Sequence, residues 1–392
     1  MRLPTLFVAA LLPAAAFAGN EAPWRTPAHP LLSLPKATVE PVIDGVINQE
    51  EWRDALQLGS FFHVELDTVA PEALATQLYL KWDTDYLYMA IRSKLAPEGT
   101  GLRASERRRG QADGIRAGDH YVFEILPVRT RGAAEVSRIG SFTWIWNALD
   151  AYADFHLNIQ PGQRGSDWVS DIDLANRVTE THWESEMRIP LAQLAHHNYA
   201  QALQLPPSVG DSWSIHAARR FGAAGDGIDL ALTPARSVFF GRQSSDWNQA
   251  WATMPEFRLM DNGVVMHLSS LGALTERRLQ PEWAFSNSGT DARTVQIDLV
   301  IRDTDGESVF TWEETLSVPG GETIPGPELL EMLPLEPSSG FLGSADDEKN
   351  KLYLRVRDDA GNFLHIAPGL PFIVFNSELK RQFERSLEIL RE

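Results

Sequence analysis

Two glutamates on one predicted strand are the first residues whose type and spacing suggest chemistry. Glu184 and Glu186 alternate with less polar side chains in residues 182–190, and this period of two predicts a half-buried strand. Same-face residues two apart on a strand lie about 7 Å apart, a separation that an inverting glycosidase tolerates between its carboxyl groups. A glycosidase pair must flank the scissile bond from opposite sides, however, whereas these side chains point the same way, beside Arg188 as a counter-charge. The pattern favours a structural role, and the sequence indicates no catalytic residue.

A second set of polar residues shares one face of another predicted strand. Asp154, His156 and Asn158 alternate with apolar residues. Their side chains could hydrogen-bond to sugar hydroxyl groups, although a solvated sheet face explains them without any ligand. A transition-metal site is not favoured, because Asn is a poor ligand and a second His is missing. The Asp-rich turns lack the spacing of an EF-hand loop, so a calcium ion stays open and no other cofactor is indicated.

Two of the 12 tryptophans lie in a polar setting. Trp247 and Trp251 fall among the Gly, Ser, Asn and Gln residues of 241–251. An exposed aromatic ring can stack on the apolar face of a sugar while polar neighbours bind its hydroxyl groups. Both are therefore candidate carbohydrate-binding residues, Trp247 before Trp251. Four other tryptophans are expected in the core, namely Trp52, Trp82, Trp183 and Trp213.

The composition restricts the partners. The formal net charge of −18 argues against nucleic acid and anionic membranes as partners. The run Arg107–Arg109 lies in a charged stretch, 94–118, for which a solvated loop is the simpler interpretation and an anion or acidic-glycan site the alternative. The chain has no cysteine, which excludes disulfides, a Cys nucleophile and Cys-ligated metals.

Residues 1–18 have the features of a secretory signal peptide. A cationic start precedes the apolar run Leu6–Ala16, and Ala16-Phe17-Ala18 forms a small-residue cleavage motif before Gly19. The apolar run is too short to span a membrane, and no later run approaches ~18 apolar residues. We expect export to the periplasm or the medium, with cleavage after Ala18.

Short strands separated by turn signals predict an all-β protein. We expect a lead segment over 19–36, a β-sandwich over 37–260, an immunoglobulin-like β-sandwich over 262–376 and a short C-terminal helix over 377–392. Phe142, Trp144 and Trp146 are expected to share one strand face, because they alternate with polar and aliphatic residues.

Helical segments are expected to be few. Asn48 is placed to cap one turn that ends at Trp52, and residues 191–203 and 328–333 each permit a short helix. Ser377 is placed to cap the last helix, whose apolar residues recur at helical spacing. We expect this helix to pack on the second sandwich, with pairing to a partner protein as the alternative.

A set of short motifs occurs in a fixed order between residues 37 and 260. It comprises Val42-Ile-Asp-Gly45 with Trp52, the hairpin from Leu80 to Tyr88, Phe155-His-Leu-Asn158, Trp183 to Pro190, Gly210-Asp-Ser-Trp213 with Arg219 or Arg220, and Trp247 before Pro255 to Leu259. In this order the motifs resemble the family 9 carbohydrate-binding module and its DOMON-like relatives, a secreted β-sandwich family. The ordered set is more specific for the fold than for sugar binding.

The resemblance implies a site in which two tryptophan rings enclose a terminal sugar, helped by a Glu and an Arg. Trp247 matches one ring, and Glu124 matches the Glu if the strand is aligned on Glu124-Ile125; the other alignment places Val122 there. His156 stands at the place of the Arg. The second ring would precede the strand at 119–124, where Arg116, Ala117 and Gly118 stand, so we hypothesise that Trp144 or Trp146 replaces it.

The predicted function is an exported, non-catalytic carbohydrate-binding protein that assists polysaccharide capture or breakdown. Its predicted carbohydrate-binding residues are Trp247, Glu124, His156, Asn158, Trp144 and Trp251. Three alternatives stay open: an envelope structural or adhesion module with a degenerate sugar site, a glycoside hydrolase accessory or enzyme acting on O-glycosyl bonds, and a DOMON-like periplasmic haem or redox protein with His156 or Met89 as ligand. The sequence leaves the oligomeric state open.

Overall fold

The computed structural model describes residues 29–64, 68–95, 102–127, 141–157, 164–165, 168–195, 205–222, 227–232, 254–338 and 349–389. The predicted signal peptide, Asn158, Trp247 and Trp251 lie outside these ranges. Within them no helix is long and apolar enough to cross a membrane.

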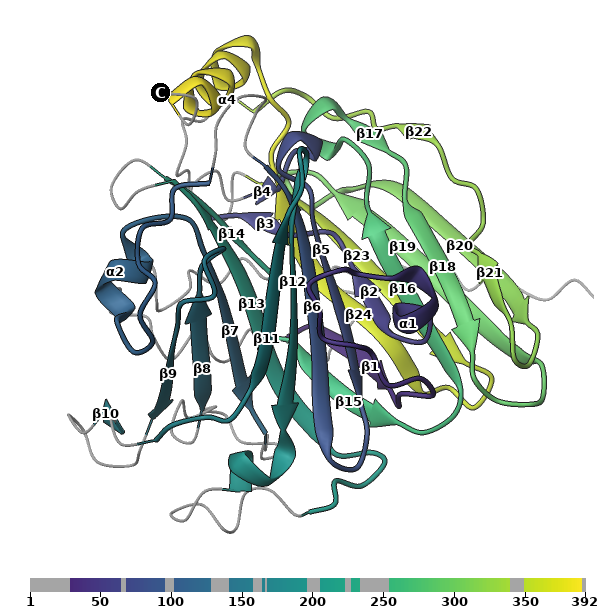
Figure 1. Ribbon diagram of the computed structural model, residues 1–392. Helices are drawn as coiled ribbons and strands as arrows, with labels where there is room; N and C mark the ends of the chain where they lie inside the picture. Colours follow the sequence, from purple (N-terminus) through teal and green to yellow (C-terminus); the bar gives the residue numbers. More distant parts are fainter. Residues whose placement is uncertain are drawn as a thin grey trace, which may run out of the picture.

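Two large β-sheets face each other and form a sandwich (Figure 1). The large sheet has the strand order β10 (Arg164–Gly165), β9 (Tyr152–Leu157), β8 (Phe142–Trp146), β7 (His120–Leu126), β13 (Ser212–Phe221), β15 (Glu256–Met260), β1 (Leu31–Pro35), β24 (Phe363–Phe372), β23 (Asn350–Asp358), β19 (Arg293–Arg302) and β20 (Ser308–Val318), with β14 (Ile228–Ala231), β3 (Phe62–His63) and β4 (Thr68–Val69) attached beside β13. The small sheet has the order β11 (Asp173–Val178), β12 (His182–Pro190), β6 (Tyr86–Lys94), β5 (Thr76–Trp82), β2 (Leu56–Leu58), β16 (Val264–Ser270), β18 (Glu282–Asn287) and β21 (Thr323–Pro325). A third sheet pairs β17 (Arg278–Leu279) with β22 (Glu331–Met332).

Both sheets continue through the position where the sequence predicts a boundary. In the large sheet, β1 pairs in parallel with β15 and antiparallel with β24, so a strand at the end of the predicted lead segment joins the two halves. In the small sheet, β2 pairs in parallel with β16 at Leu58 and Leu268. The all-β sandwich is therefore confirmed, but the structure does not show residues 262–376 as a separate immunoglobulin-like domain.

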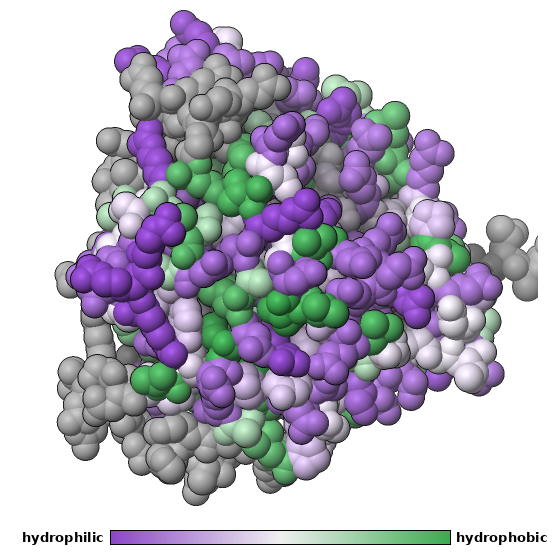
Figure 2. All heavy atoms as spheres, viewed as in Figure 1, coloured by the Kyte–Doolittle hydropathy of each residue, from purple (hydrophilic) through white to green (hydrophobic). Residues whose placement is uncertain are grey.

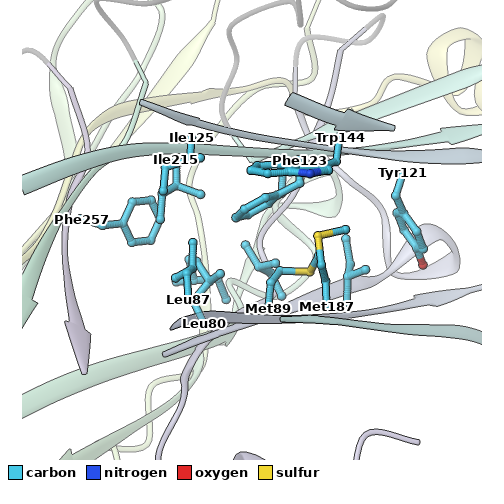
Figure 3. Close-up of a cluster of buried hydrophobic side chains, with 14 of the residues drawn as sticks. Leu80, Leu87, Met89, Tyr121, Phe123, Ile125, Trp144, Met187, Ile215 and Phe257 are labelled. Carbon is cyan, nitrogen blue, oxygen red and sulfur yellow. The ribbon is translucent and has the colours of Figure 1, made fainter. Parts of the chain in front are cut away.

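Although the sheets are continuous, the buried apolar side chains form two main clusters. The first cluster is rich in aromatic rings and includes three of the four tryptophans predicted for the core, Trp82, Trp183 and Trp213. The fourth, Trp52, packs in a smaller cluster with Tyr79 and Tyr88. Figure 3 shows its side chains pointing from the two sheets toward each other, with Met89 and Met187 on one side and Phe123 and Trp144 on the other. The second cluster, between the later strands, is mainly Leu, Ile and Val.

Short helices lie at the ends of strands. Helix α1 (Gln49–Trp52) is confirmed, and the Asn48 side chain accepts a hydrogen bond from Glu50 N–H at 3.0 Å as its cap. Only residues 191–195 of the segment 191–203 are described, as the 3₁₀ helix η2 (Leu191–Ala195). The prediction of a short helix at 328–333 is wrong, because this segment is extended and includes strand β22. Helix α2 (Ala112–Arg116) lies in the stretch that the sequence predicts as a loop.

The C-terminal helix α4 (Ser377–Ile389) folds back on the first half of the molecule (Figure 1). Phe383 packs edge-on against His63 of β3, with 6.1 Å between ring centroids, and belongs to the first core cluster. The expectation that it packs on the second sandwich is therefore wrong for Phe383, although Lys380 of the same helix pairs with Glu276 of the second half at 3.8 Å. Its cap is Asn376 instead of Ser377, because the Asn376 side chain accepts hydrogen bonds from the backbone N–H groups of Glu378 and Leu379.

Candidate functional site

The two glutamates of β12 hold the outer surface of the small sheet together. The Glu186 carboxylate accepts hydrogen bonds from Trp52 Nε1 at 2.7 Å and from the backbone N–H groups of Asp44 at 3.0 Å and Gly45 at 2.8 Å. Glu184 pairs with Arg92 at 2.6 Å. Burial raises the pKa of Glu186, against the lowering effect of its three donors. The structural interpretation of this pair is supported, since every contact serves the fold.

Arg188 is not the counter-charge of these glutamates. Its guanidinium pairs with Asp173 at 2.6 Å and with Glu40 at 2.8 Å. Arg92 of the neighbouring strand takes the expected place, because the β12–β6 register sets it directly opposite Glu184. Cross-strand neighbours are closer than same-face residues two apart on one strand, which explains the exchange.

Trp144 and His156 lie on the core face of the large sheet. The Trp144 ring is fully buried, and its Nε1 donates a hydrogen bond to Ser170 Oγ at 3.0 Å. The His156 ring stacks on Phe142, with 4.5 Å between centroids and an interplanar angle of 21°. Trp144 is therefore packed in the core, as is the equally buried Trp146, and the hypothesis that one of them replaces a sugar-facing ring remains a prediction.

Other residues singled out in the sequence share this core side. Asp154, opposite Trp144 across the β8–β9 pair, accepts hydrogen bonds from the N–H and the hydroxyl of Ser170, at 2.6 and 2.7 Å. Met89, a ligand in the haem alternative, faces Met187 across the strand pair and is buried in the first core cluster. These residues position backbone segments and fill the core.

Glu124 points to the opposite, outer face of the large sheet. Tyr121, Phe123 and Ile125 of β7 enter the core, so the alternation sends Glu124 outward. The register places Glu124 opposite Thr143 of β8 on one side and opposite His216 of β13 on the other. Thr143 is in turn opposite Phe155 of β9.

Four side chains thus form one line across four strands, Phe155, Thr143, Glu124 and His216, which we call the outer row. Thr143 Oγ1 donates a hydrogen bond to Glu124 Oε1 at 3.0 Å. Of the residues predicted from the sequence, the outer row contains only Glu124; Thr143, Phe155 and His216 were not predicted for the site. Period-two alternation in the sequence indicates which residues of one strand share a face. It does not indicate which strands pair or in what register, and both are needed to bring these four residues into one row.

His216 is the unusual member of the outer row. Its side chain is buried, with 2% of the residue exposed, yet neither ring nitrogen has a hydrogen-bond partner. Burial lowers the pKa of His216 to about 4, so the ring is neutral at pH 7, with one N–H donor and one acceptor nitrogen. Each unpaired buried polar atom costs about 1–3 kcal/mol. A buried group with this deficit is a candidate ligand contact.

His216 lies beside described residues that come before and after the segment 233–253 in the sequence. Strand β13 pairs with β15 through Ser212–Ser214 and with β14 through Ala218–Phe221, and His216 lies between the two. Leu232 N–H donates to Ala217 O at 2.9 Å, and Ile215 N–H donates to Pro255 O at 3.3 Å. Both described ends of the segment that carries Trp247 and Trp251 are therefore fixed beside His216, and the roles of these tryptophans remain predictions.

Helix α2 packs on the outer face at the Phe155 end of the outer row. Ile115 lies in an apolar cluster with Val122, Ile145 and Ala153, which share the outer face with the row. The Arg116 guanidinium lies over the Phe155 ring, 5.6 Å from its centroid. Arg116 stands where the resemblance would place the second aromatic ring, and the aromatic ring in this region of the structure is Phe155.

A cavity of about 400 Å³ lies away from the outer row, between the two halves of the molecule. The 3₁₀ helices η1 (Glu72–Leu74) and η3 (Leu274–Glu276) contribute to its wall, together with Ser269 to Ala273. None of its described lining residues is aromatic. It lacks the stacking surface that sugar recognition commonly uses.

Comparison with known proteins finds similarity to solved structures. No protein-family model and no curated protein sequence matches the chain. A family 9 carbohydrate-binding module from Caldicellulosiruptor kristjanssonii, solved with cellotriose, has 12% identity and a TM-score of 0.38, covering 59% of this chain and 94% of the module. A proposed carbohydrate-binding protein from Bacteroides uniformis has 11% identity and a TM-score of 0.41, covering 58% of this chain and 98% of its own.

The family that the sequence motifs resemble is thus among the solved structures similar to this chain, which match over 58–59% of it. Identities near 12% and TM-scores near 0.4 transfer no ligand and no role.

Proposed function

We propose that the outer row binds carbohydrate without catalysis. The observation that carries this proposal is His216, a buried neutral ring with two unpaired nitrogens beside the Glu124–Thr143 pair. A sugar hydroxyl both donates and accepts hydrogen bonds, so adjacent hydroxyls can satisfy the donor and the acceptor nitrogen of the His216 ring. Phe155 supplies an apolar ring at the other end of the outer row.

Glu124, Thr143 and His216 are at most 2% exposed, so the ligand reaches them only when the outer row opens. The pairing of His216 with sugar hydroxyls then offsets part of the cost of that opening. The half-buried Phe155 is the accessible end from which the sugar enters.

A binding role is favoured over glycoside hydrolysis by the acidic groups available. Among the described residues of the outer row, Glu124 is the carboxylate, whereas retaining and inverting mechanisms both require a pair. Glu184 and Glu186 lie on the other sheet and are bound to Arg92, Trp52 and backbone N–H groups. Release of reducing sugar by the purified protein, abolished in Glu124→Gln, would instead support the hydrolase alternative.

The setting of this activity is an exported protein that captures polysaccharide in the periplasm or the medium. The signal-peptide pattern of residues 1–18 supports this part of the proposal. The second half, 262–376, would act as an immunoglobulin-like unit that extends the sandwich and fixes the orientation of the binding half through the shared sheets.

The test is binding of the protein from Gly19 onward to a panel of plant, algal and microbial polysaccharides, by affinity electrophoresis and calorimetry. We expect binding to at least one polysaccharide, reduced tenfold or more in His216→Phe and in Glu124→Gln, because each loses hydrogen bonds to the ligand. Glu313→Gln, on the exposed edge strand β20, is the matched control and retains full binding. Failure to bind any member of the panel would remove the proposal.

A further inference from the structure

The free edge of the second half carries a large share of the negative charge. Residues 303–338 contain nine Asp and Glu residues and no Lys, Arg or His, so they hold −9 of the formal net charge of −18. Within the part of the chain that the structure describes, none of these nine carboxylates forms an ion pair. Figure 2 shows mainly hydrophilic side chains over the region of β18 to β21, with small hydrophobic patches among them. A field of one sign at one edge concentrates cations there.

A half-buried tryptophan lies at this edge. Trp312 belongs to β20, the last strand of the large sheet (Figure 1). It is directly opposite Leu299 of β19, which points into the second core cluster, so the Trp312 ring lies on the same side of the sheet. The ring stacks on Trp283 of β18, with 5.6 Å between ring centroids and an interplanar angle of 29°. The two rings therefore connect the large sheet to the small sheet near the free edge.

Trp283 is held in place, whereas Trp312 keeps a free donor. Trp283 Nε1 donates a hydrogen bond to Pro327 O at 2.8 Å, and Gly326 lies so close that a Cβ there would overlap the Trp283 ring. No acceptor among the described residues takes a hydrogen bond from Trp312 Nε1, and this nitrogen is accessible to solvent. An accessible indole on a fixed support, with an unused N–H, is suited to stacking on a sugar ring.

Two exposed carboxylates accompany the tryptophan pair. Glu314, two residues beyond Trp312 on the same face of β20, accepts a hydrogen bond from Thr315 N–H at 3.2 Å and has no cationic partner in the described chain. Glu328 follows Pro327, the acceptor of Trp283. Acidic side chains protect a free edge strand from pairing with other chains. Protection of the edge does not explain an accessible tryptophan with an unused N–H beside them.

We propose that Trp312, Glu314 and Glu328 form a second glycan site, whose ligand is a polysaccharide of amino sugars with free, protonated amino groups. The apolar face of one sugar ring stacks on Trp312, and a hydroxyl accepts the indole N–H. The ammonium groups donate charge-assisted hydrogen bonds to Glu314 and Glu328. A neutral glycan gains nothing from the charge of 303–338, and an anionic glycan is repelled by it. The site does not depend on the outer row.

The experiment measures affinity by calorimetry and tryptophan fluorescence in mildly acidic buffer, with the protein from Gly19 onward. The probes are a glucosamine oligomer, the fully N-acetylated oligomer of the same length and an oligolysine of the same charge. We expect the glucosamine oligomer to bind at least tenfold more tightly than the N-acetylated one, because acetylation removes the charge. Its binding should weaken between about 50 and about 500 mM salt, because added salt screens exposed charges.

The key variant is Glu314→Gln, which should lower affinity for the glucosamine oligomer about tenfold and leave affinity for the N-acetylated oligomer unchanged. Glu313→Gln is the matched control, because it removes the same charge from the other face of β20, and its affinity should stay within about twofold. Trp312→Ala should lower affinity for the glucosamine oligomer tenfold or more, and Trp312→Phe should retain part of it. His216→Phe, in the outer row, should leave this affinity unchanged.

Three results would overturn the inference. Equal affinity for the glucosamine and the N-acetylated oligomers removes the amino-sugar ligand. Oligolysine that binds as tightly as the glucosamine oligomer, with no loss in Trp312→Ala, indicates attraction of any polycation without stacking. Loss of binding in His216→Phe, with full binding in Glu314→Gln and Trp312→Phe, assigns the glycan to the outer row and supports only the function proposed above. Conversely, binding that depends on Trp312 and Glu314 but not on His216 supports this inference even if the outer row binds no glycan.

Discussion

Two buried histidines, one on each sheet, show how differently the molecule treats its buried polar groups. His267 on β16 accepts a hydrogen bond from Gln57 N–H at Nδ1, 3.2 Å away, and its Nε2 lies 2.8 Å from Ser286 Oγ. His216 on β13 is equally inaccessible, and neither of its nitrogens is paired. Burial lowers the pKa of both rings to about 4. The two histidines therefore have similar pKa values, and they differ in whether their ring nitrogens have hydrogen-bond partners.

Each sheet also carries a buried carboxylate, and the two carboxylates differ in what they connect. Glu186 on the small sheet meets three donors that belong to the loop 44–52, so its contacts connect parts of the fold. Glu124 meets Thr143 within its own sheet face and lies opposite the unpaired ring of His216. A structural polar cluster has all its partners inside the protein, whereas a binding cluster keeps some of its hydrogen-bonding capacity for another molecule.

The largest expected effect is on the structural side of this comparison. Glu186→Ala leaves Trp52 Nε1 and two backbone N–H groups without an acceptor, so the free energy of unfolding should fall by about 3–5 kcal/mol. Urea denaturation at pH 7 measures this change. Glu313→Ala, on an exposed position, is the control and should stay within about 0.5 kcal/mol of the unmodified protein. A loss below about 1 kcal/mol would contradict the structural role.

His267→Phe should be the next most damaging change. The ring size is kept, but Gln57 N–H and Ser286 Oγ lose their partner in a buried site, at a cost of about 2–4 kcal/mol. Urea denaturation of the His267→Phe variant at pH 7 measures this loss of stability. If His267→Phe proves as harmless as the corresponding change at His216, the distinction between the two histidines does not hold.

Both histidines should contribute to acid sensitivity. Each has a pKa near 4 in the folded protein and about 6.5 in the unfolded chain, so between these values the unfolded chain binds the additional proton. Stability is therefore lost as the pH falls from about 6.5 to about 4, by up to about 1.4 kcal/mol per pH unit for each histidine. Stability of His216→Phe measured at several pH values should show a shallower slope than that of the unmodified protein; an unchanged slope would mean that His216 is already protonated or exposed.

The smallest effect on stability is expected at His216 itself. His216→Phe removes two unpaired polar atoms, so at pH 7 the free energy of unfolding should change by no more than about 1 kcal/mol, or increase. Glycan binding should nevertheless fall tenfold or more. The pair of measurements sharpens the comparison, because a structural residue would lose stability first and a binding residue loses affinity first. Large destabilisation with intact binding would falsify the assignment.

Much of the architecture could be predicted from alternation alone. The β5–β6 hairpin, β12 ending at Pro190 and the capped turn after Asn48 agree with the sequence. Alternation could not identify which face of a strand meets the core. All seven residues of β7 are buried, because the core covers one face and the cluster around Ile115 of α2 covers part of the other. Hydrophobicity then does not distinguish the faces.

The residues of the candidate site could not be predicted for the same reason, since the sequence does not show which face of a strand each side chain occupies. Glu124 and His156 were predicted to act together, but the register sends Glu124 outward and His156 onto Phe142 in the core. A shift of one residue in alignment reverses the face of a side chain, so a motif match cannot decide it. The contribution of His216 depends on pairing between strands about 90 residues apart, which no local pattern encodes.

The insertion of β1 between β15 and β24 has a consequence for the order in which the chain can fold. Ser33 Oγ donates a hydrogen bond to Leu364 O, across 331 residues, so β1 can complete its pairing only after β24 has been synthesised. Such long-range contacts give high contact order and slow folding. A fragment that ends near residue 260 would leave β1 as an unprotected edge and would also lose α4 from His63. The binding half is therefore best produced together with the second half, and a chain interrupted between them should aggregate.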